Sequence, residues 1–329
     1  MLFFLSMVIG TLVAISSYSW LSMWMGLEIN LLSIIPLMSD IKNKFPSESA
    51  LKYFITQALA SSILLFSIVI SLNFFDFFSS NKILNLIFDS ALLMKVGAAP
   101  FHAWFPEVIE GLNWNNSLIL LTWQKIAPML LIFYNSNLSL FFLSVILLST
   151  IFSGILGLNQ ISLRKILAYS SINHISWMLA SMLHSQFIWV IYFLIYSIIT
   201  LSMILIFKNM QIFYLTQFFN FANSDKLTKF FISLNFLSLG GLPPFLGFFP
   251  KWLVINNLVE NNLYFLSTLL IVFTLITLYF YIRVMFSSLT INSSEFLIKN
   301  NSIKNFYIYI FNFISLSGLI ICTLLFNYT

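Results

Sequence analysis

GAAPFHAWFPE, residues 97–107, interrupts a run of apolar residues that otherwise has the length and character of a membrane-spanning helix. A second stretch, residues 241–251, reads GLPPFLGFFPK and fits the same template, G-x-x-P-F-x-x-[WF]-F-P-[EK]. Proline lacks a backbone N–H and clashes with the preceding helical turn, so each stretch predicts a break within a helix. Such breaks leave free carbonyls and helix-end dipoles, which inside a membrane protein can stabilise an ion or hold water.

The composition around these two stretches is that of a membrane protein. Of 329 residues, 60% are hydrophobic and 8% are charged, whereas a soluble domain carries about 25% charged residues. We therefore expect one transmembrane domain, residues 1–329. The only cysteine, Cys322, excludes an internal disulfide or a metal-thiolate site. The first 20 residues lack a basic region and a cleavage site, so they are expected to form the first crossing.

Apolar segments of roughly 20 residues predict an all-α polytopic fold with about eleven transmembrane helices. The expected crossings are 3–19, 20–38, 48–72, 83–104, 115–134, 138–157, 161–181, 186–207, 227–258, 262–286 and 305–326.

The basic residues predict an orientation. Lys and Arg in short loops favour the inner side of a membrane. The connections after crossings two, six, eight and ten carry Lys42, Lys44, Lys52, Arg164, Lys165, Lys208, Lys226, Lys229, Arg283, Lys299 and Lys304. The other side carries only Lys82. This asymmetry places the N-terminus inside and the C-terminus outside. It also explains the net charge of +5 by topology, so no nucleic-acid partner is expected.

Four ionisable residues lie within the expected crossings: Glu28 and Lys125 near the middle of theirs, and Lys95 and Lys251 next to the two helix breaks. A charge at the bilayer centre costs roughly 2.5 to 3.5 kcal/mol, so these groups are expected to face a protein interior or a hydrated cavity. Burial disfavours the charged form and a neighbouring opposite charge restores it, and lysine, unlike arginine, can lose its proton when buried. Such a series of sites suits proton transfer. The alternative is that buried ion pairs only hold the helices together.

Two histidines extend this series. His102 lies within the first break, where it could connect Lys95 to the next site. His174 shares a face with Arg164 and Ser171, within about 80° on a helical wheel, which fits either a hydrated path or hydrogen bonds between helices. No metal-ligand spacing, phosphate-binding glycine loop or G-x-S-x-G motif is present. No bound metal or cofactor, and no redox or hydrolytic chemistry, is therefore expected in this chain.

The two breaks also predict an internal repeat. A continuous helix over residues 227–258 would extend about 48 Å, against a hydrocarbon core of about 30 Å. The breaks fall in crossings four and nine. Crossing nine is the fifth crossing after crossing four, so the chain runs through the membrane in the opposite direction there. The expected architecture is an inverted repeat of the antiporter-like kind with two discontinuous helices. Its half-repeats are approximately 20–157 and 161–326, preceded by the first helix, 3–19. The alternative is that G-x-x-P-F is a common kink.

Five runs of the sequence resemble a known family. They are WMGLEINLLS, LLMKVGAAPFHAWFPEV, LTWQKIAPML, GLNQISLRKILAYSSINHISWM and FLSLGGLPPFLGFFPKW. They resemble the NADH dehydrogenase (ubiquinone) subunit 2 family of mitochondrial respiratory complex I, in its short animal form of arthropod type. The resemblance extends over nearly the whole chain.

The resemblance implies a core membrane-arm subunit of the proton-pumping NADH:ubiquinone oxidoreductase. The pumping residues of that family fall on Glu28, Lys95, Lys125 and Lys251, and residues of its hydrated axis match His102 and His174. FMN, the iron–sulfur clusters and ubiquinone would be bound by other subunits.

The implied location is the mitochondrial inner membrane, with the N-terminus in the matrix and the C-terminus in the intermembrane space. The implied partners are other membrane-arm and accessory subunits and membrane lipids, with cardiolipin as a candidate. Two other functions remain open at this point: a stand-alone cation/proton antiporter of the related family, and a structural spacer.

Overall fold

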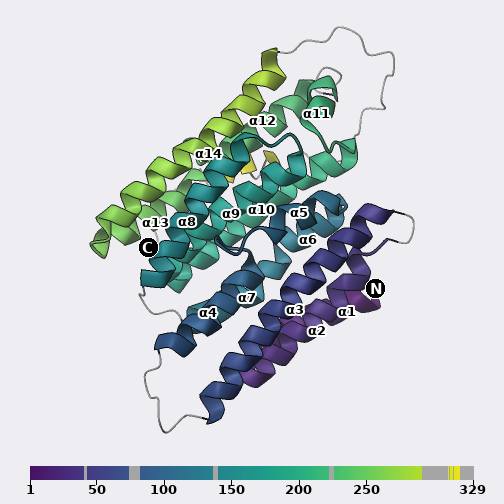
Figure 1. Ribbon diagram of the computed structural model, residues 1–329. Coiled ribbons are helices and arrows are strands. Elements are labelled where there is room, and N and C mark those ends of the chain that lie inside the picture. Colours follow the sequence, from purple (N-terminus) through teal and green to yellow (C-terminus); the bar gives the residue numbers. More distant parts are fainter. Residues whose placement is uncertain are drawn as a thin grey trace. The chain divides into compact units, whose positions relative to one another are not determined.

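The computed structural model describes residues 1–40, 43–73, 82–135, 140–221, 226–290, 310, 312–313 and 315–318. Within these residues every regular element is a helix, and the β-type pairing is limited to one isolated bridge between Ser162 and Tyr214. The chain divides into two compact units, Met1–Val145 and Ile146–Thr329. In Figure 1 the first unit runs from purple to blue and the second from teal to yellow.

The first unit is built from helices that pack mainly on their neighbours in sequence. Its helices are α1 (Leu2–Ser16), α2 (Trp20–Met38), α3 (Lys44–Asn73), α4 (Lys82–Val96), α5 (Trp104–Gly111), α6 (Trp114–Leu121) and α7 (Trp123–Asn135). Helix α2 packs on α1 and α3, while α4 contacts both α3 and α7. Helix α8 (Leu140–Leu158) begins in this unit and continues into the second.

Helix α3 shows how the sequence turns polar side chains toward the interior of the first unit. Its buried positions recur every three or four residues, the spacing of one helix face. They include Ser49, Ala50, Tyr53, Gln57, Ala60, Ser61, Leu64, Ser67 and Ile68. The opposite face exposes large apolar side chains such as Leu51, Ile55, Leu59 and Phe66, as expected for contact with lipid. Tyr53 and Gln57 are therefore directed inward.

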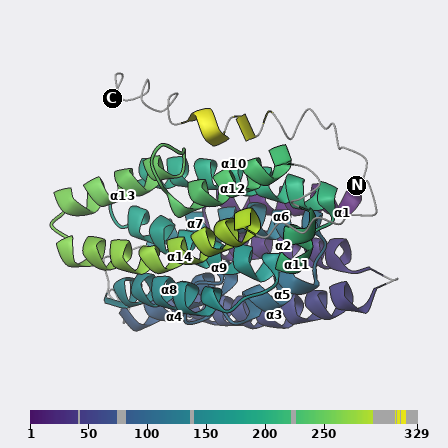
Figure 2. The same ribbon diagram turned by 90° about the horizontal axis from the view of Figure 1, so that it is seen from above.

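The second unit surrounds one buried helix. Its helices are α9 (Leu163–Met182), α10 (Gln186–Met210), α11 (Leu215–Phe221), α12 (Lys226–Gly240), α13 (Phe248–Glu260) and α14 (Tyr264–Thr290). Helix α9 contacts α10, α13 and α14, and α12 lies beside α10 and α14 (Figure 2). All residues from Ile166 to Met182 are buried, including the polar side chains of His174 and Asn173.

The all-α membrane fold predicted from the sequence is confirmed. Six described helices are long and apolar enough to cross a membrane: Trp20–Met38, Lys44–Leu72, Trp114–Asn135, Leu140–Leu158, Gln186–Met210 and Tyr264–Phe286. The first ten expected crossings are all helical, and two are interrupted at the predicted breaks. Most of the eleventh, 305–326, lies outside the described residues, so the number of crossings stays a prediction. The short helix α11 was not anticipated.

The crossing expected over 115–134 is present as one span, Trp114–Asn135, with a local irregularity that the sequence did not predict. The irregularity lies at Thr122, where α6 ends and α7 begins. Pro128, six residues further on, has no N–H to donate to the carbonyl of Gln124. A proline within a helix distorts the turn that precedes it, and this turn lies next to Lys125.

Candidate functional site

The two matching sequence stretches form the same backbone structure. Gly97 has a φ of 82° and Gly241 a φ of 77°, a region open to glycine but unfavourable for other residues. The N–H after each glycine bonds to the carbonyl five residues earlier, at 3.1 Å from Ala98 to Leu93 and 3.3 Å from Leu242 to Leu237. This bond is the mark of a Schellman helix end.

The similarity continues beyond the two glycines. A cis peptide bond precedes Pro100 in the first stretch and Pro244 in the second. The helix then restarts at equivalent positions, with α5 at Trp104 and α13 at Phe248. Both predicted helix breaks are therefore present, and both contain the hydrogen bond that spans five residues.

Lys251 occupies the second break. It lies in the first turn of α13, with 7% of its surface exposed. Its Nζ donates to the carbonyl of Gly240 at 2.8 Å and, more weakly, to that of Leu239 at 3.4 Å. These are carbonyls at the end of α12, where the helix dipole is negative. The break thus provides a site for the lysine ammonium group.

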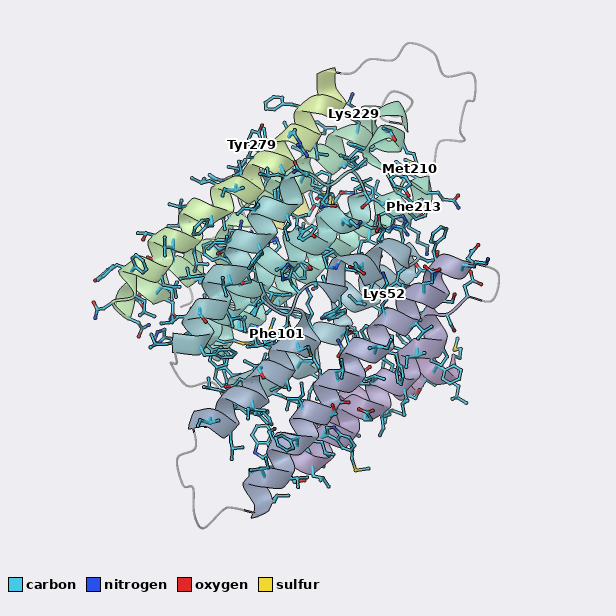
Figure 3. The ribbon with its side chains drawn as sticks, in the orientation of Figure 1. Lys52, Phe101, Met210, Phe213, Lys229 and Tyr279 are labelled. Atoms are coloured by element: carbon cyan, nitrogen blue, oxygen red, sulfur yellow. The ribbon has the colours of Figure 1, made fainter. Side chains whose placement is uncertain are left out.

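Glu107, which matches Lys251 in the template, is placed differently. It lies on the surface of the first unit and forms an ion pair with Lys52, which is labelled on α3 in Figure 3. The distance from Nζ of Lys52 to Oε2 of Glu107 is 2.7 Å. The two side chains are 56% and 54% exposed, and a pair in this setting contributes at most about 1 kcal/mol. The last positions of the two stretches therefore differ in setting as well as in charge: Glu107 forms a surface ion pair, whereas Lys251 is buried.

Glu28 and Lys95 lie close enough for their charges to interact. Lys95 is in the last turn of α4 and is 8% exposed. One carboxylate oxygen of Glu28, Oε2, is buried without a hydrogen-bond partner among the described residues. A buried oxygen of this kind is costly unless water or a proton satisfies it. Two of the predicted site residues therefore interact.

Lys125 is the most deeply buried charged side chain that the structure describes, at 1% exposed. Its Nζ lies 5.4 Å from the centre of the Phe105 ring, within cation–π distance. Phe105 follows the first break, and its N–H bonds to the carbonyl of His102 at 3.0 Å. His102 is itself buried between α4 and α5. The first break therefore places the main chain of His102 beside Phe105, whose ring contacts Lys125.

His174 lies at the buried centre of α9. Its Nδ1 is 2.9 Å from the hydroxyl of Tyr192 on α10, and its ring is 5.0 Å from that of Tyr196. One turn further along α9, the ring of Trp177 lies 5.9 Å from Nζ of Lys251. Within the second unit, α9 thus carries His174 and a contact of Lys251 on successive turns. The sequence did not identify Tyr192, because two buried helices must pack before the pair exists.

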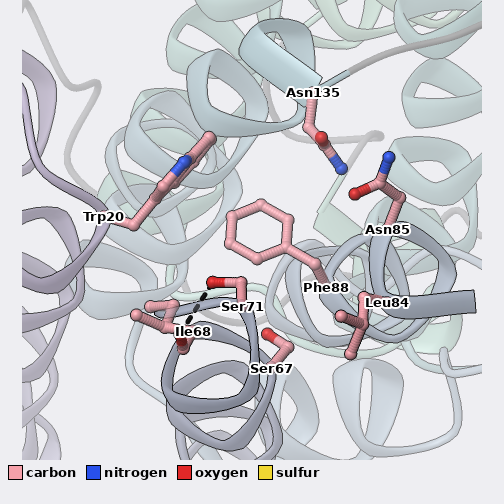
Figure 4. A pocket seen from close by; sticks show the side chains of 8 residues that line it. All are labelled: Trp20, Ser67, Ile68, Ser71, Leu84, Asn85, Phe88 and Asn135. Atoms are coloured by element: carbon pink, nitrogen blue, oxygen red, sulfur yellow. Dashed lines mark hydrogen bonds between the residues drawn. The ribbon is translucent and has the colours of Figure 1, made fainter. Parts of the chain in front are cut away.

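Two cavities are lined by described residues of the first unit. The smaller lies between α2, α3, α4 and α7 and is lined in part by Lys95. The larger has about 80 Å³ of room for water centres and is lined by Trp20, Ser67, Ile68, Ser71, Leu84, Asn85, Phe88 and Asn135, with the Phe88 ring at its middle (Figure 4). Asn135, one of its lining residues, donates a 2.7 Å hydrogen bond to Asp89. Asp89 therefore joins α4 to α7.

A metal centre has no support in the described part of the chain, where no group of three His, Cys, Asp or Glu side chains could hold an ion. The site instead contains single ionisable groups: Lys251 contacts carbonyls at a helix end, Lys125 an aromatic ring and His174 a tyrosine hydroxyl. This arrangement suits the movement of protons between neighbouring groups.

Comparison with known proteins agrees with this arrangement. Residues 17–277 match the family described as NADH:quinone oxidoreductase/Mrp antiporter, TM. The NADH-ubiquinone oxidoreductase chain 2 of Anopheles gambiae is 51% identical, over 99% of this chain and 97% of that protein. The same protein of Aedes aegypti is 54% identical over the same shares of the two chains.

A solved structure shows the same fold. A chain in the structure of respiratory complex I from Thermus thermophilus with bound aureothin superposes with a TM-score of 0.77 and 24% identity. The match covers 87% of this chain and 70% of that one. Together with the insect relatives, which match almost from end to end, this fold shows that the chain belongs to the NADH-ubiquinone oxidoreductase chain 2 family.

Proposed function

We propose that this chain is a membrane-arm subunit of proton-pumping NADH:ubiquinone oxidoreductase and that its buried ionisable residues carry protons across the inner membrane. The path would use Glu28, Lys95, Lys125 and Lys251, with His102 and His174 as relays between them. The observation that carries this proposal is the burial of three lysines, each at most 8% exposed, in an apolar helical protein. The chain would thus provide part of the enzyme's proton path.

The surroundings of these lysines support the proposal. A buried ammonium group is tolerated only where nearby charges, dipoles or water replace its hydration. Lys251 has the carbonyls at the end of α12, and Lys95 has Glu28 and a cavity. A proton that arrives at one site changes the charge at its neighbour, so the sites can load and unload in turn.

The energy for pumping would come from other subunits of the enzyme. We propose that FMN, the iron–sulfur clusters and ubiquinone are bound there, and that this chain binds no cofactor. Its partners would be the neighbouring membrane-arm and accessory subunits and membrane lipids, cardiolipin among them. We place the N-terminus in the matrix and the C-terminus in the intermembrane space.

A stand-alone cation/proton antiporter is the second candidate, since the matching family description also covers Mrp antiporters. The near full-length match to chain 2 of the insect enzymes favours the subunit. Purification distinguishes them: an antiporter would exchange ions in vesicles without redox subunits, and the proposed subunit would not.

The test of the proton path uses the assembled enzyme with Lys125→Ala or Glu28→Gln. Both variants remove a group that can change its charge, so we expect fewer protons pumped per electron in complexes that still assemble. Lys52→Ala is the control, because it removes only the surface ion pair with Glu107. Normal pumping in fully assembled Lys125→Ala and Glu28→Gln complexes would contradict the path and favour a spacer.

A further inference from the structure

The smaller cavity of the first unit has the size and lining of a site for one water molecule. It has about 20 Å³ of room for the centre of a water, slightly above the roughly 10 to 15 Å³ that one water needs. Its walls are Leu27, Asn30, Leu31, Tyr53, Gln57, Lys95, Gln124 and Pro128. Five of these side chains are polar, whereas a buried water needs two to four polar partners.

Lys95 requires such a partner. Its side chain is more than nine-tenths buried and lines the cavity. Within the described part of the chain its ammonium group donates no hydrogen bond, although its backbone carbonyl accepts a long one, 3.4 Å, from Gln57. A buried donor left unsatisfied is costly, and a water in the adjoining cavity would satisfy it.

An amide pair forms the opposite wall. Asn30 on α2 donates from Nδ2 to Oε1 of Gln124 at 3.0 Å, and Gln124 on α7 donates from Nε2 to Oδ1 of Asn30 at 2.9 Å. The hydroxyl of Tyr53 points to the same Oε1 at 3.5 Å. Because each amide donates to the other, the orientation of both side chains is fixed.

Two further features connect this wall of the cavity to the turn of α7 that carries Lys125. Gln124 immediately precedes Lys125, so the amide pair also holds the turn of α7 that carries the lysine. Pro128 lines the cavity and cannot donate to the main-chain carbonyl of Gln124. That carbonyl therefore receives no hydrogen bond from residue 128 and can accept one from another donor.

We infer that Asn30 and Gln124, with Tyr53, are positioning residues that hold one water between the Lys95 ammonium group and the turn of α7 that carries Lys125. The water accepts a hydrogen bond from the ammonium group of Lys95 and donates one to the main-chain carbonyl of Gln124. The amides release no proton themselves, but they fix the water that extends the reach of Lys95 toward Lys125. This inference rests on the proposed function and names residues that the proton path requires beyond its ionisable groups.

The first test is to break and then restore the pair in the assembled enzyme. In Asn30→Leu or Gln124→Leu the remaining amide loses its partner and the water its fixed wall. We expect proton pumping to be slower by up to about 100-fold, the scale of a misplacement of a reacting group by about 1 Å. The exchanged pair, Asn30→Gln with Gln124→Asn, keeps both amides and should recover most of the rate.

A purely structural role is distinguished by the solvent isotope effect. Loss of the water makes proton transfer at this step limiting, so the deuterium isotope effect on pumping should rise in Gln124→Leu and fall again in the exchanged pair. An unchanged isotope effect, or unchanged pumping in an assembled single variant, overturns the inference. If the leucine variants do not assemble, Tyr53→Phe decides, since it removes one hydroxyl and should give a smaller change in the same direction; no change also overturns it.

The outcome is separable from that of the proposed function. Loss of pumping in Lys125→Ala with normal pumping in Gln124→Leu would refute only the positioning role. Normal pumping in both would refute the proton path. A high-resolution map of the assembled enzyme should also show a density peak in this cavity within hydrogen-bonding distance of Lys95, and a dry cavity in such a map would overturn the water site.

Discussion

Three buried lysines illustrate how much the surroundings of a single residue determine its role. Lys251 donates to carbonyls at a helix end, Lys95 faces a small polar cavity, and Lys125 lies against an aromatic ring. The carbonyls accept hydrogen bonds from the ammonium group, whereas the ring offers its π-face. The three sites therefore differ in the partners that they offer to a charged lysine.

Lys251→Arg separates proton transfer from helix capping. Arginine can donate to the carbonyls of Gly240 and Leu239, but it keeps its proton under all accessible conditions. If Lys251 must release a proton, the variant enzyme should assemble and yet pump at a small fraction of the normal rate. The measurement is the number of protons moved per electron in reconstituted vesicles.

Lys52→Arg is the matched control, because it makes the same replacement in an exposed ion pair and should leave pumping unchanged. Normal pumping in an assembled Lys251→Arg enzyme would show instead that residue 251 acts only as a fixed charge at the helix end.

The depth of the site residues was predictable from the sequence, but their partners were not. An isolated lysine within a long apolar run must be buried, and all three lysines are. The partner of His174, by contrast, is Tyr192 on another helix, and the partner of Gln124 is 94 positions away. Such pairs arise only from packing, which the periodicity of one helix does not specify.

At the scale of elements, the two breaks have a similar backbone conformation but hold different side chains. Gly97 and Gly241 end their helices in the same way. A Cβ atom added at Gly97 would lie 3.3 Å from the ring of Phe105, a tight contact. At Gly241 it would lie 2.7 Å from Cδ and 3.0 Å from Nζ of Lys251. Gly241 therefore also provides the space that the lysine occupies.

Gly241→Ala should thus impair pumping more than Gly97→Ala. Both variants place a side chain at a positive φ, which costs roughly 1 to 2 kcal/mol, so their effects on assembly should be similar. Only Gly241→Ala displaces Lys251 from the carbonyls of α12. We expect a larger fall in protons pumped per electron for Gly241→Ala, measured in complexes of equal assembly. Equal pumping by the two variants would contradict the role given to the second break.

The interruption at Thr122 shows the limit of reasoning from helix length. The two predicted breaks were identifiable because each combines glycine with proline in a repeated pattern, and one also lies in an overlong segment. Pro128 stands alone in a run of normal length, and an isolated proline can either kink a helix or be accommodated in it. Pro36 is accommodated within α2, so the outcome at Pro128 depended on the surrounding helices.

At the scale of the whole molecule, the composition determined the fold class, and hydropathy located most helices. Helix α9 is instructive: the sequence predicted it as the crossing 161–181, yet its 20 residues are absent from the six spans that length and composition select. Its polar side chains are tolerated because it is surrounded by other helices and not by lipid. The half-repeats 20–157 and 161–326 stay a prediction, supported by the matching hydrogen bonds at the two breaks.

The orientation in the membrane also stays a prediction, and two exposed asparagines provide its test. Asn159 lies in the turn between α8 and α9, on the side that we expect to face the matrix. Asn261 lies in the turn between α13 and α14, on the side that we expect to face the intermembrane space. Three predicted crossings separate them if α12 and α13, on either side of the second break, together cross the membrane once.

Cysteine replacements at the two positions should therefore react from opposite sides. A membrane-impermeant thiol reagent should label Asn261→Cys in mitoplasts and Asn159→Cys only in inverted inner-membrane vesicles. The unmodified chain, with Cys322, provides the background. Labelling with the two sides exchanged would reverse the orientation. Labelling of both positions from one side would mean that the chain turns back at the second break, and α12 and α13 could then no longer form one discontinuous crossing that carries Lys251 into the membrane.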